Sequence, residues 1–109
     1  MKIKKFLPKS VNWDKIPSEK ISSTTGFAEI KKQTVGQIQV RLVQYSKNFF
    51  ADHWCEKGHI LFIVDGDFSL EHSDKSVIKL TKGMSYFVGD DSMSHCASSE
   101  EGAKVFIVD

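Results

Sequence analysis

The chain has 109 residues, of which 40% are hydrophobic, and this length suits a single domain with one core. Its formal net charge of +1 comes from 15 basic and 14 acidic residues, so no global field attracts nucleic acid or anionic lipid. No segment approaches the roughly 18 consecutive apolar residues that cross a bilayer, so we expect no membrane partner.

The opening run MKIKKFLPKS is basic but lacks the apolar core and cleavage site of a secretory signal. A cytoplasmic location is therefore expected. The two cysteines, Cys55 and Cys96, are then expected to be reduced and free to bind metal or to pack as small side chains.

Residues 1–25 are predicted to form an irregular arm with room for one short strand. They contain both prolines, Pro8 and Pro17, and show no sustained hydrophobic period. Trp13 and Ile16 are the side chains expected to hold this arm against the rest of the molecule. An arm of this length can cover an exposed strand edge of a second copy, so we expect a homodimer.

From Gly26 onward, short β-prone runs alternate with turn residues, and the segment 26–109 is predicted to be one β-domain. Ile38, Val40 and Leu42, for example, alternate with polar residues at a period of two. Asp65-Gly66 predicts a hairpin turn. Strands are predicted at 27–35, 37–45, 51–56, 59–64, 67–72, 76–80, 85–88, 94–98 and 103–108. Many short, evenly spaced strands without helices are typical of an all-β sandwich or barrel.

Three of the four histidines, His53, His59 and His95, lie beside predicted strand–turn junctions. Cys55 is two residues after His53, so on a strand both side chains would share one face. His59 shares its face with Leu61 and therefore with the expected interior. Imidazole nitrogen and thiolate sulfur together suit zinc, iron, nickel or copper ions.

Each of these residues also has a purely structural explanation, because a single buried histidine or cysteine is commonly a packed core residue. Strand alternation directs Asp52 away from the interior. His72, which is beside acidic residues, is expected at the surface. Cys96 is predicted to face away from His95, so a disulfide between Cys55 and Cys96 is not expected.

The spacing between the three histidines and Cys55 is more specific than any one of these residues alone. His53-x-Cys55, three residues, His59, six residues, Gly66 resembles the first cupin motif, and Gly83, Gly89 and His95 resemble the second. The resemblance covers residues 35–109 and implies a small cupin-type double-stranded β-helix, a jelly-roll barrel. More narrowly, the runs Ala51-Asp52-His53-Trp54-Cys55 and Lys57-Gly58-His59-Ile60 resemble the small single-domain cupins with a DHCW motif.

In metal-dependent cupins the motif residues hold the ion, and the resemblance therefore implies the ligands His53, Cys55, His59 and His95. The chain departs from the general motif where Cys55 replaces a histidine and His59 replaces a glutamate. The set then contains a thiolate and no carboxylate, which favours a softer divalent ion: zinc first, with iron or nickel as alternatives.

Three functional classes stay open at this point. An open coordination position would make the protein an enzyme that acts on a small organic molecule inside the barrel. Four ligands would close the site and make the metal structural, in a binding or sensing module. The third class is a partner protein with no metal and no catalysis. No acid or base occupies a recognisable interior position of the motifs, so the residues leave enzymatic activity undecided.

Overall fold

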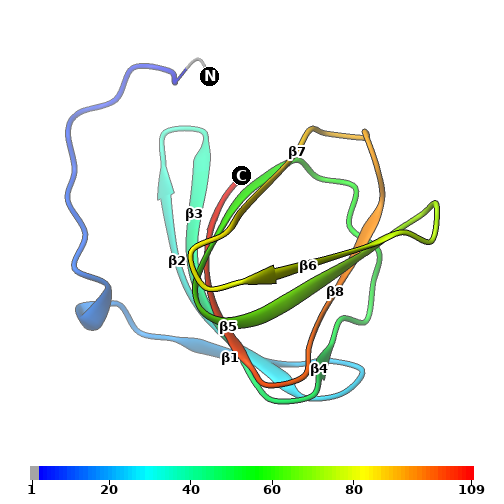
Figure 1. Cartoon of the computed structure of the whole chain (residues 1–109). Coiled ribbons are helices and arrows are strands. Elements are labelled where there is room, and N and C mark those ends of the chain that lie inside the picture. Colours follow the sequence, from blue (N-terminus) through cyan, green and yellow to red (C-terminus); the bar gives the residue numbers. More distant parts are fainter. Residues whose placement is uncertain (1–2) are drawn as a thin grey trace.

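The computed structural model describes residues 3–109; Met1 and Lys2, the start of the predicted arm, lie outside the described residues (Figure 1). The arm runs alongside the barrel and contains the short 3-10 helix η1 (Trp13–Lys15). The Trp13 ring packs edge-on against Phe106 with 6.4 Å between ring centroids, which holds the arm on the sheet. Strand β1 (Glu19–Ser22) follows and pairs with β2, so the first strand lies within the predicted arm.

Within the described residues, nine strands pair antiparallel in two sheets that share β5 and curl into a barrel (Figure 1). After β1 come β2 (Phe27–Val35), β3 (Ile38–Tyr45), β4 (Phe49–Phe50), β5 (His59–His72), β6 (Val77–Thr81), β7 (Ser85–Val88), β8 (His95–Ser99) and β9 (Ala103–Val108). One sheet has the order β1-β2-β3-β9-β5-β7 and the other the order β6-β5-β8-β4. The all-β barrel predicted from the sequence is confirmed.

Strand β5 belongs to both sheets, because it continues through Asp65 and Gly66 with a register shift between Ile63 and Asp65. The predicted hairpin at Asp65-Gly66 is therefore wrong. Gly66 has a φ of +85°, and a Cβ at this position would press on the Gly102 carbonyl oxygen. A glycine is needed here because two backbones pass closely at a bulge where the strand changes sheets.

This close approach predicts a stability difference between two glycine variants. Gly83 also has a positive φ, +89°, but its Cβ would meet no atom within 4 Å. Gly83→Ala is expected to cost about 1 kcal/mol from backbone strain alone. Gly66→Ala adds a backbone clash and is expected to cost at least about 2 kcal/mol. Urea unfolding of both variants measures the difference; equal losses would show that the bulge can relax around the added methyl group.

The bulge also changes which residues of β5 face inward. Leu61 and Ile63 are buried before the bulge, whereas Phe68, Leu70 and His72 are buried after it. The expectation that His72 lies at the surface is therefore wrong: its residue is 5% exposed, and Nε2 lies 2.8 Å from the Tyr86 hydroxyl. A continuous period of two places His72 outside, and one extra residue in the strand moves it inside.

The predicted strand at 51–56 is also wrong, because only Phe49–Phe50 is a strand in this region. The chain then runs as a loop and touches the barrel again at an isolated bridge between Cys55 and His95. Two backbone hydrogen bonds, of 2.8 Å and 3.0 Å, hold this bridge. The two side chains are therefore placed by backbone pairing, while His53 lies in the loop before it.

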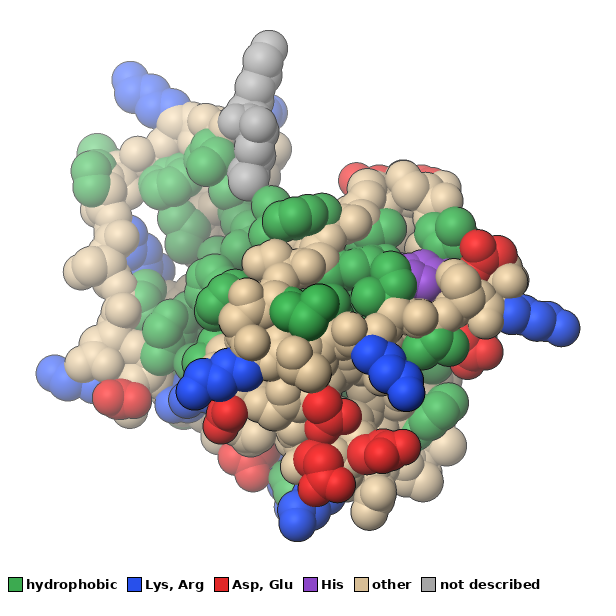
Figure 2. Space-filling model, in the orientation of Figure 1, with side chains coloured by type: hydrophobic (Ala, Val, Ile, Leu, Met, Phe, Trp, Pro, Cys, Tyr) green, Lys and Arg blue, Asp and Glu red, His purple; other side chains and the backbone are tan. Residues whose placement is uncertain are grey.

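Apolar side chains also lie on the surface of the described residues (Figure 2). They include Phe6 and Leu7 on the arm and Phe62 and Phe87 on strands β5 and β7. These exposed groups suit an interface, and the homodimer stays a prediction, as does the cytoplasmic location. Within residues 3–109 no helix is long and apolar enough to span a bilayer.

Candidate metal centre

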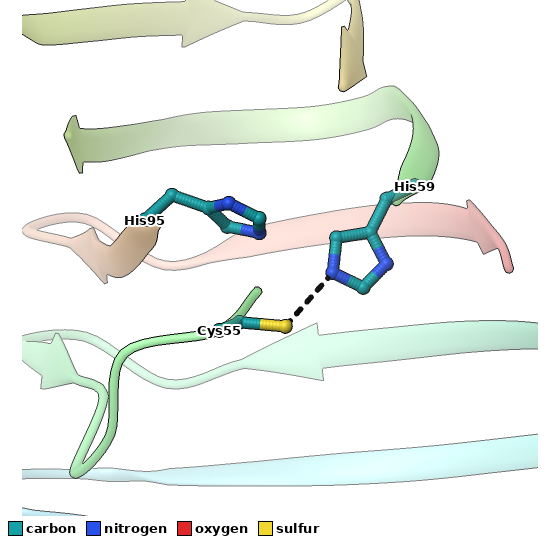
Figure 3. A group of neighbouring side chains, drawn as sticks. All are labelled: Cys55, His59 and His95. Atoms are coloured by element: carbon teal, nitrogen blue, oxygen red, sulfur yellow. Dashed lines mark hydrogen bonds between the residues drawn. The ribbon is translucent and has the colours of Figure 1, made fainter. Parts of the chain in front are cut away.

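Three of the four predicted ligands lie together, with their side chains close to one another (Figure 3). Cys55 comes from the loop after β4, His59 begins β5, and His95 begins β8. One potential ligand atom from each residue lies within 4.8 Å of the others. Cys55 Sγ lies 3.2 Å from His59 Nε2. Residues from three separate segments thus offer one sulfur and two nitrogens to a common point.

The hydrogen bonds at Nδ1 of His59 and of His95 determine which nitrogen of each ring is free to bind a metal ion. His59 Nδ1 lies 3.1 Å from the Asp109 carboxylate, and His95 Nδ1 lies 3.0 Å from the Met93 carbonyl oxygen. Both partners can only accept, so each Nδ1 carries the proton and each Nε2 keeps its lone pair. A carboxylate or carbonyl group behind a histidine is the usual arrangement that orients a metal-ligating ring.

The residues present fit a transition-metal ion. His95 Nε2 is buried and has no hydrogen-bond partner among the described residues. A buried polar atom without a hydrogen-bond partner lowers the stability of the fold by about 1–3 kcal/mol, so a bound group that pairs with this nitrogen is expected. An ion bound by Cys55 and His59 would supply that partner, and thiolate with imidazole is a donor set typical of zinc.

The ionisation states agree with this assignment. Burial lowers the pKa of His59; the neighbouring Asp109 carboxylate opposes this effect, and His95 adds to it. Neutral imidazole is the form that coordinates metal. Burial raises the pKa of the Cys96 thiol, whose Sγ points to the Ala51 carbonyl oxygen, 3.8 Å away. Cys96 is therefore a packed neutral thiol outside the cluster, and both cysteines are free.

The fourth predicted ligand, His53, lies apart from this group. Its side chain is 70% exposed, and Nδ1 lies 2.9 Å from the Asp52 carboxylate. That hydrogen bond lowers the pKa of Asp52. His53 nevertheless lines the same cavity as the three clustered residues. Its role as a metal ligand stays a prediction.

The cluster forms part of the wall of an interior cavity of about 130 Å³. Most of the wall is apolar and comes from Phe49, Ala51, Leu61, Phe68, Leu70, Ala97 and Ile107. Arg41 and Tyr45, both on β3, are the further polar groups that line it. Burial raises the pKa of Tyr45 to about 12, so its phenol is neutral at physiological pH. The arrangement is a small apolar chamber with a few polar groups, as ligand sites commonly are.

Sequence reasoning missed two residues of the site, Arg41 and Asp109. Arg41 Nη2 lies 2.9 Å from the Asp109 carboxylate, which in turn accepts from His59, and the Asp109 side chain is 8% exposed. Arg41 shares its strand parity with buried Val43, but the sequence alone does not show which face of this strand is buried. Asp109 is 68 residues from Arg41 and 50 residues from His59 in the sequence, and no local sequence pattern predicts contacts over such separations.

Solved structures with similar folds support this description. A cupin-2 domain protein from Shewanella frigidimarina has a TM-score of 0.61 and 19% identity, over 73% of this chain and 78% of that chain. A predicted oxalate decarboxylase from Thermotoga maritima has a TM-score of 0.75 and 14% identity, over 92% and 96%. The iron(II) form of HppE has a TM-score of 0.70 and 16% identity; the match spans 87% of this chain and 56% of HppE.

The chain matches no protein-family model and no curated protein, so the resemblance to the DHCW group stays a prediction. The strand pairing and the solved structures nevertheless agree on one architecture. The chain therefore has a cupin-type fold.

Proposed function

We propose that this protein is a metal-dependent cupin that acts on a small organic molecule held inside its barrel. The observation that carries the proposal is the position of the cluster: Cys55, His59 and His95 lie in the wall of a cavity rather than in a closed core. Three protein ligands leave a coordination position for a substrate or water, which is the arrangement of catalytic rather than structural sites.

The cluster would hold the ion through Cys55 Sγ and the two Nε2 atoms. A zinc ion bound there would supply Lewis acidity, which would polarise a carbonyl group of a ligand in the cavity. Asp109 holds the His59 ring, and the Met93 carbonyl holds the His95 ring. The mainly apolar wall lowers the local dielectric constant and so strengthens electrostatic interactions within the chamber. Among the structural neighbours, HppE was solved with Fe(II), which supports a metal-dependent role for this fold.

The alternative is a binding or sensing module in which His53 completes a closed structural site. One observation favours it, because His53 lines the cavity that the other three residues share. The 70% exposure of its side chain and its hydrogen bond to Asp52 favour the open site. The two functions differ in whether an outside ligand can reach the ion.

The number of coordination positions can be tested with cobalt and azide. Cobalt(II) replaces zinc in such sites, and its visible spectrum changes when an added ligand enters its coordination sphere. Azide is expected to change the spectrum of the wild-type protein and of His53→Ala alike. His53→Ala is also expected to retain metal within about threefold of wild-type affinity, because an exposed side chain outside the cluster contributes little.

A structural site gives the opposite pattern. The wild-type spectrum would then be insensitive to azide, and a response would arise only after His53→Ala opened a position. That result would assign His53 as the fourth ligand and remove the basis for catalysis.

A further inference from the structure

Arg41 places a positive charge inside the barrel, where charged groups are costly unless they have a partner. Its side chain is 21% exposed and lines the cavity with Tyr45. Nη2 donates to Asp109, whereas Nε is buried and has no hydrogen-bond partner within residues 3–109. A guanidinium has five N–H donors, so Arg41 keeps donors that Asp109 does not occupy.

The charges around the cavity do not balance once the proposed metal is counted. A divalent ion and Arg41 bring three positive charges, whereas the Cys55 thiolate and the Asp109 carboxylate bring two negative ones. His59 and His95 coordinate in neutral form. Counted over the ion and these side chains, one positive charge is left over beside a mainly apolar chamber. A single bound anion would neutralise it.

The cavity sets the size and character of that anion. Its volume of about 130 Å³ is close to that of an engineered apolar cavity, about 150 Å³, that accommodates benzene. Leu61, Phe68 and Ile107 in the wall suit a short hydrocarbon group. An inorganic anion would leave this apolar surface without a partner, so the anion should have an organic part.

We propose that the cavity binds a small monocarboxylate whose carboxylate lies between Arg41 and the metal centre. This inference rests on the proposed function, since the ion supplies the surplus charge. A planar guanidinium matches a carboxylate in shape and donates charge-assisted hydrogen bonds to it, which a lysine does less well. Arg41 is thus the residue that selects carboxylate ligands, and the apolar wall limits their length.

Binding of acetate, compared with its neutral isostere acetamide, tests the proposal without an assay of turnover. Both compounds are titrated into zinc-loaded and metal-free protein, and dissociation constants are taken from amide chemical shifts in NMR spectra. Zinc-loaded wild type is expected to bind acetate at least tenfold more tightly than acetamide. Metal-free protein is expected to bind acetate more weakly but with the same dependence on Arg41.

Arg41→Gln is expected to weaken acetate binding at least tenfold and to leave acetamide binding unchanged. Arg41→Lys should restore part of the loss. Lys104→Gln is the matched control, because Lys104 is an exposed cation on β9, and its acetate binding should equal that of wild type.

Two results would overturn the proposal: equal affinity for acetate and acetamide, or acetate binding that Arg41→Gln does not change in either form of the protein. Zinc content is measured in the same samples. It shows whether the carboxylate site fails while the metal centre is intact, or whether the metal centre of the proposed function fails. Protein that binds no zinc but shows Arg41-dependent acetate binding would retain the carboxylate site and lose the metal centre.

Discussion

Replacement of Cys55 by serine is expected to lower zinc affinity at least about a hundredfold, whereas Cys96→Ser should stay within about threefold of wild type. Cys55 Sγ lies 3.2 Å from His59 Nε2 and belongs to the cluster. Cys96 is buried, and its Sγ points to a backbone carbonyl oxygen outside the cluster. A serine hydroxyl is a far poorer ligand for a soft ion than a thiolate. Competition with a chromophoric chelator measures both affinities on untagged protein.

Urea unfolding of the metal-free proteins is the control for these cysteine variants. It separates loss of a ligand from loss of the fold, since both side chains pack inside the molecule. Alkylation gives an independent readout: Cys55 should be protected in zinc-loaded protein and react after chelation, because metal binding holds it as a coordinated thiolate. Equal zinc content in the two serine variants would mean that Cys55 is only a packed thiol.

Asp109→Asn is expected to weaken zinc binding by about ten- to a hundredfold, although Asp109 is not a ligand. Its carboxylate accepts the His59 Nδ1 proton at 3.1 Å and holds the ring with Nε2 toward the cluster. An asparagine has no charge to increase the basicity of the imidazole, and its amide nitrogen can turn toward Nδ1. The same variant leaves Arg41 without its ionic partner. Zinc affinity is again measured by chelator competition.

Asp14→Asn is the matched control for Asp109→Asn, because it removes one carboxylate charge from an exposed position in η1. Zinc affinity should not change in this control. An unchanged affinity in Asp109→Asn would show that His59 is oriented by the barrel alone. A similar loss in both variants would attribute the effect to overall charge instead of to the contact with His59.

Most of the strands were predictable because turn residues and alternation are local signals. Strands β2, β7 and β9 have the bounds that the sequence predicts. The errors at Asp65-Gly66 and His72 have one physical origin, which is that pairing with distant strands overrides a local pattern. Asp65-Gly66 has the composition of a hairpin turn, yet its neighbours Gly102 and Ala103 make it a bulge. That bulge moved His72 from the expected surface into the core.

The site was predictable to the extent that motif spacing reflects the fold. Cys55, His59 and His95 converge, as the resemblance to cupins implied. His53 does not join them, because the segment around it is a loop, and strand alternation does not govern its direction. Arg41 could not be assigned from its strand, because both faces of β3 carry apolar and polar residues. Which face is inside depends on pairing with β9.

X-ray absorption at the zinc edge of zinc-loaded protein tests the metal centre most directly. The cluster predicts one sulfur at about 2.3 Å and two imidazole nitrogens at about 2.0 Å in the first shell, with the remaining position taken by a light atom. Cys55→Ser should remove the sulfur contribution and leave the imidazole pattern. A first shell made only of nitrogen and oxygen in the wild-type protein would contradict a metal centre built from Cys55, His59 and His95.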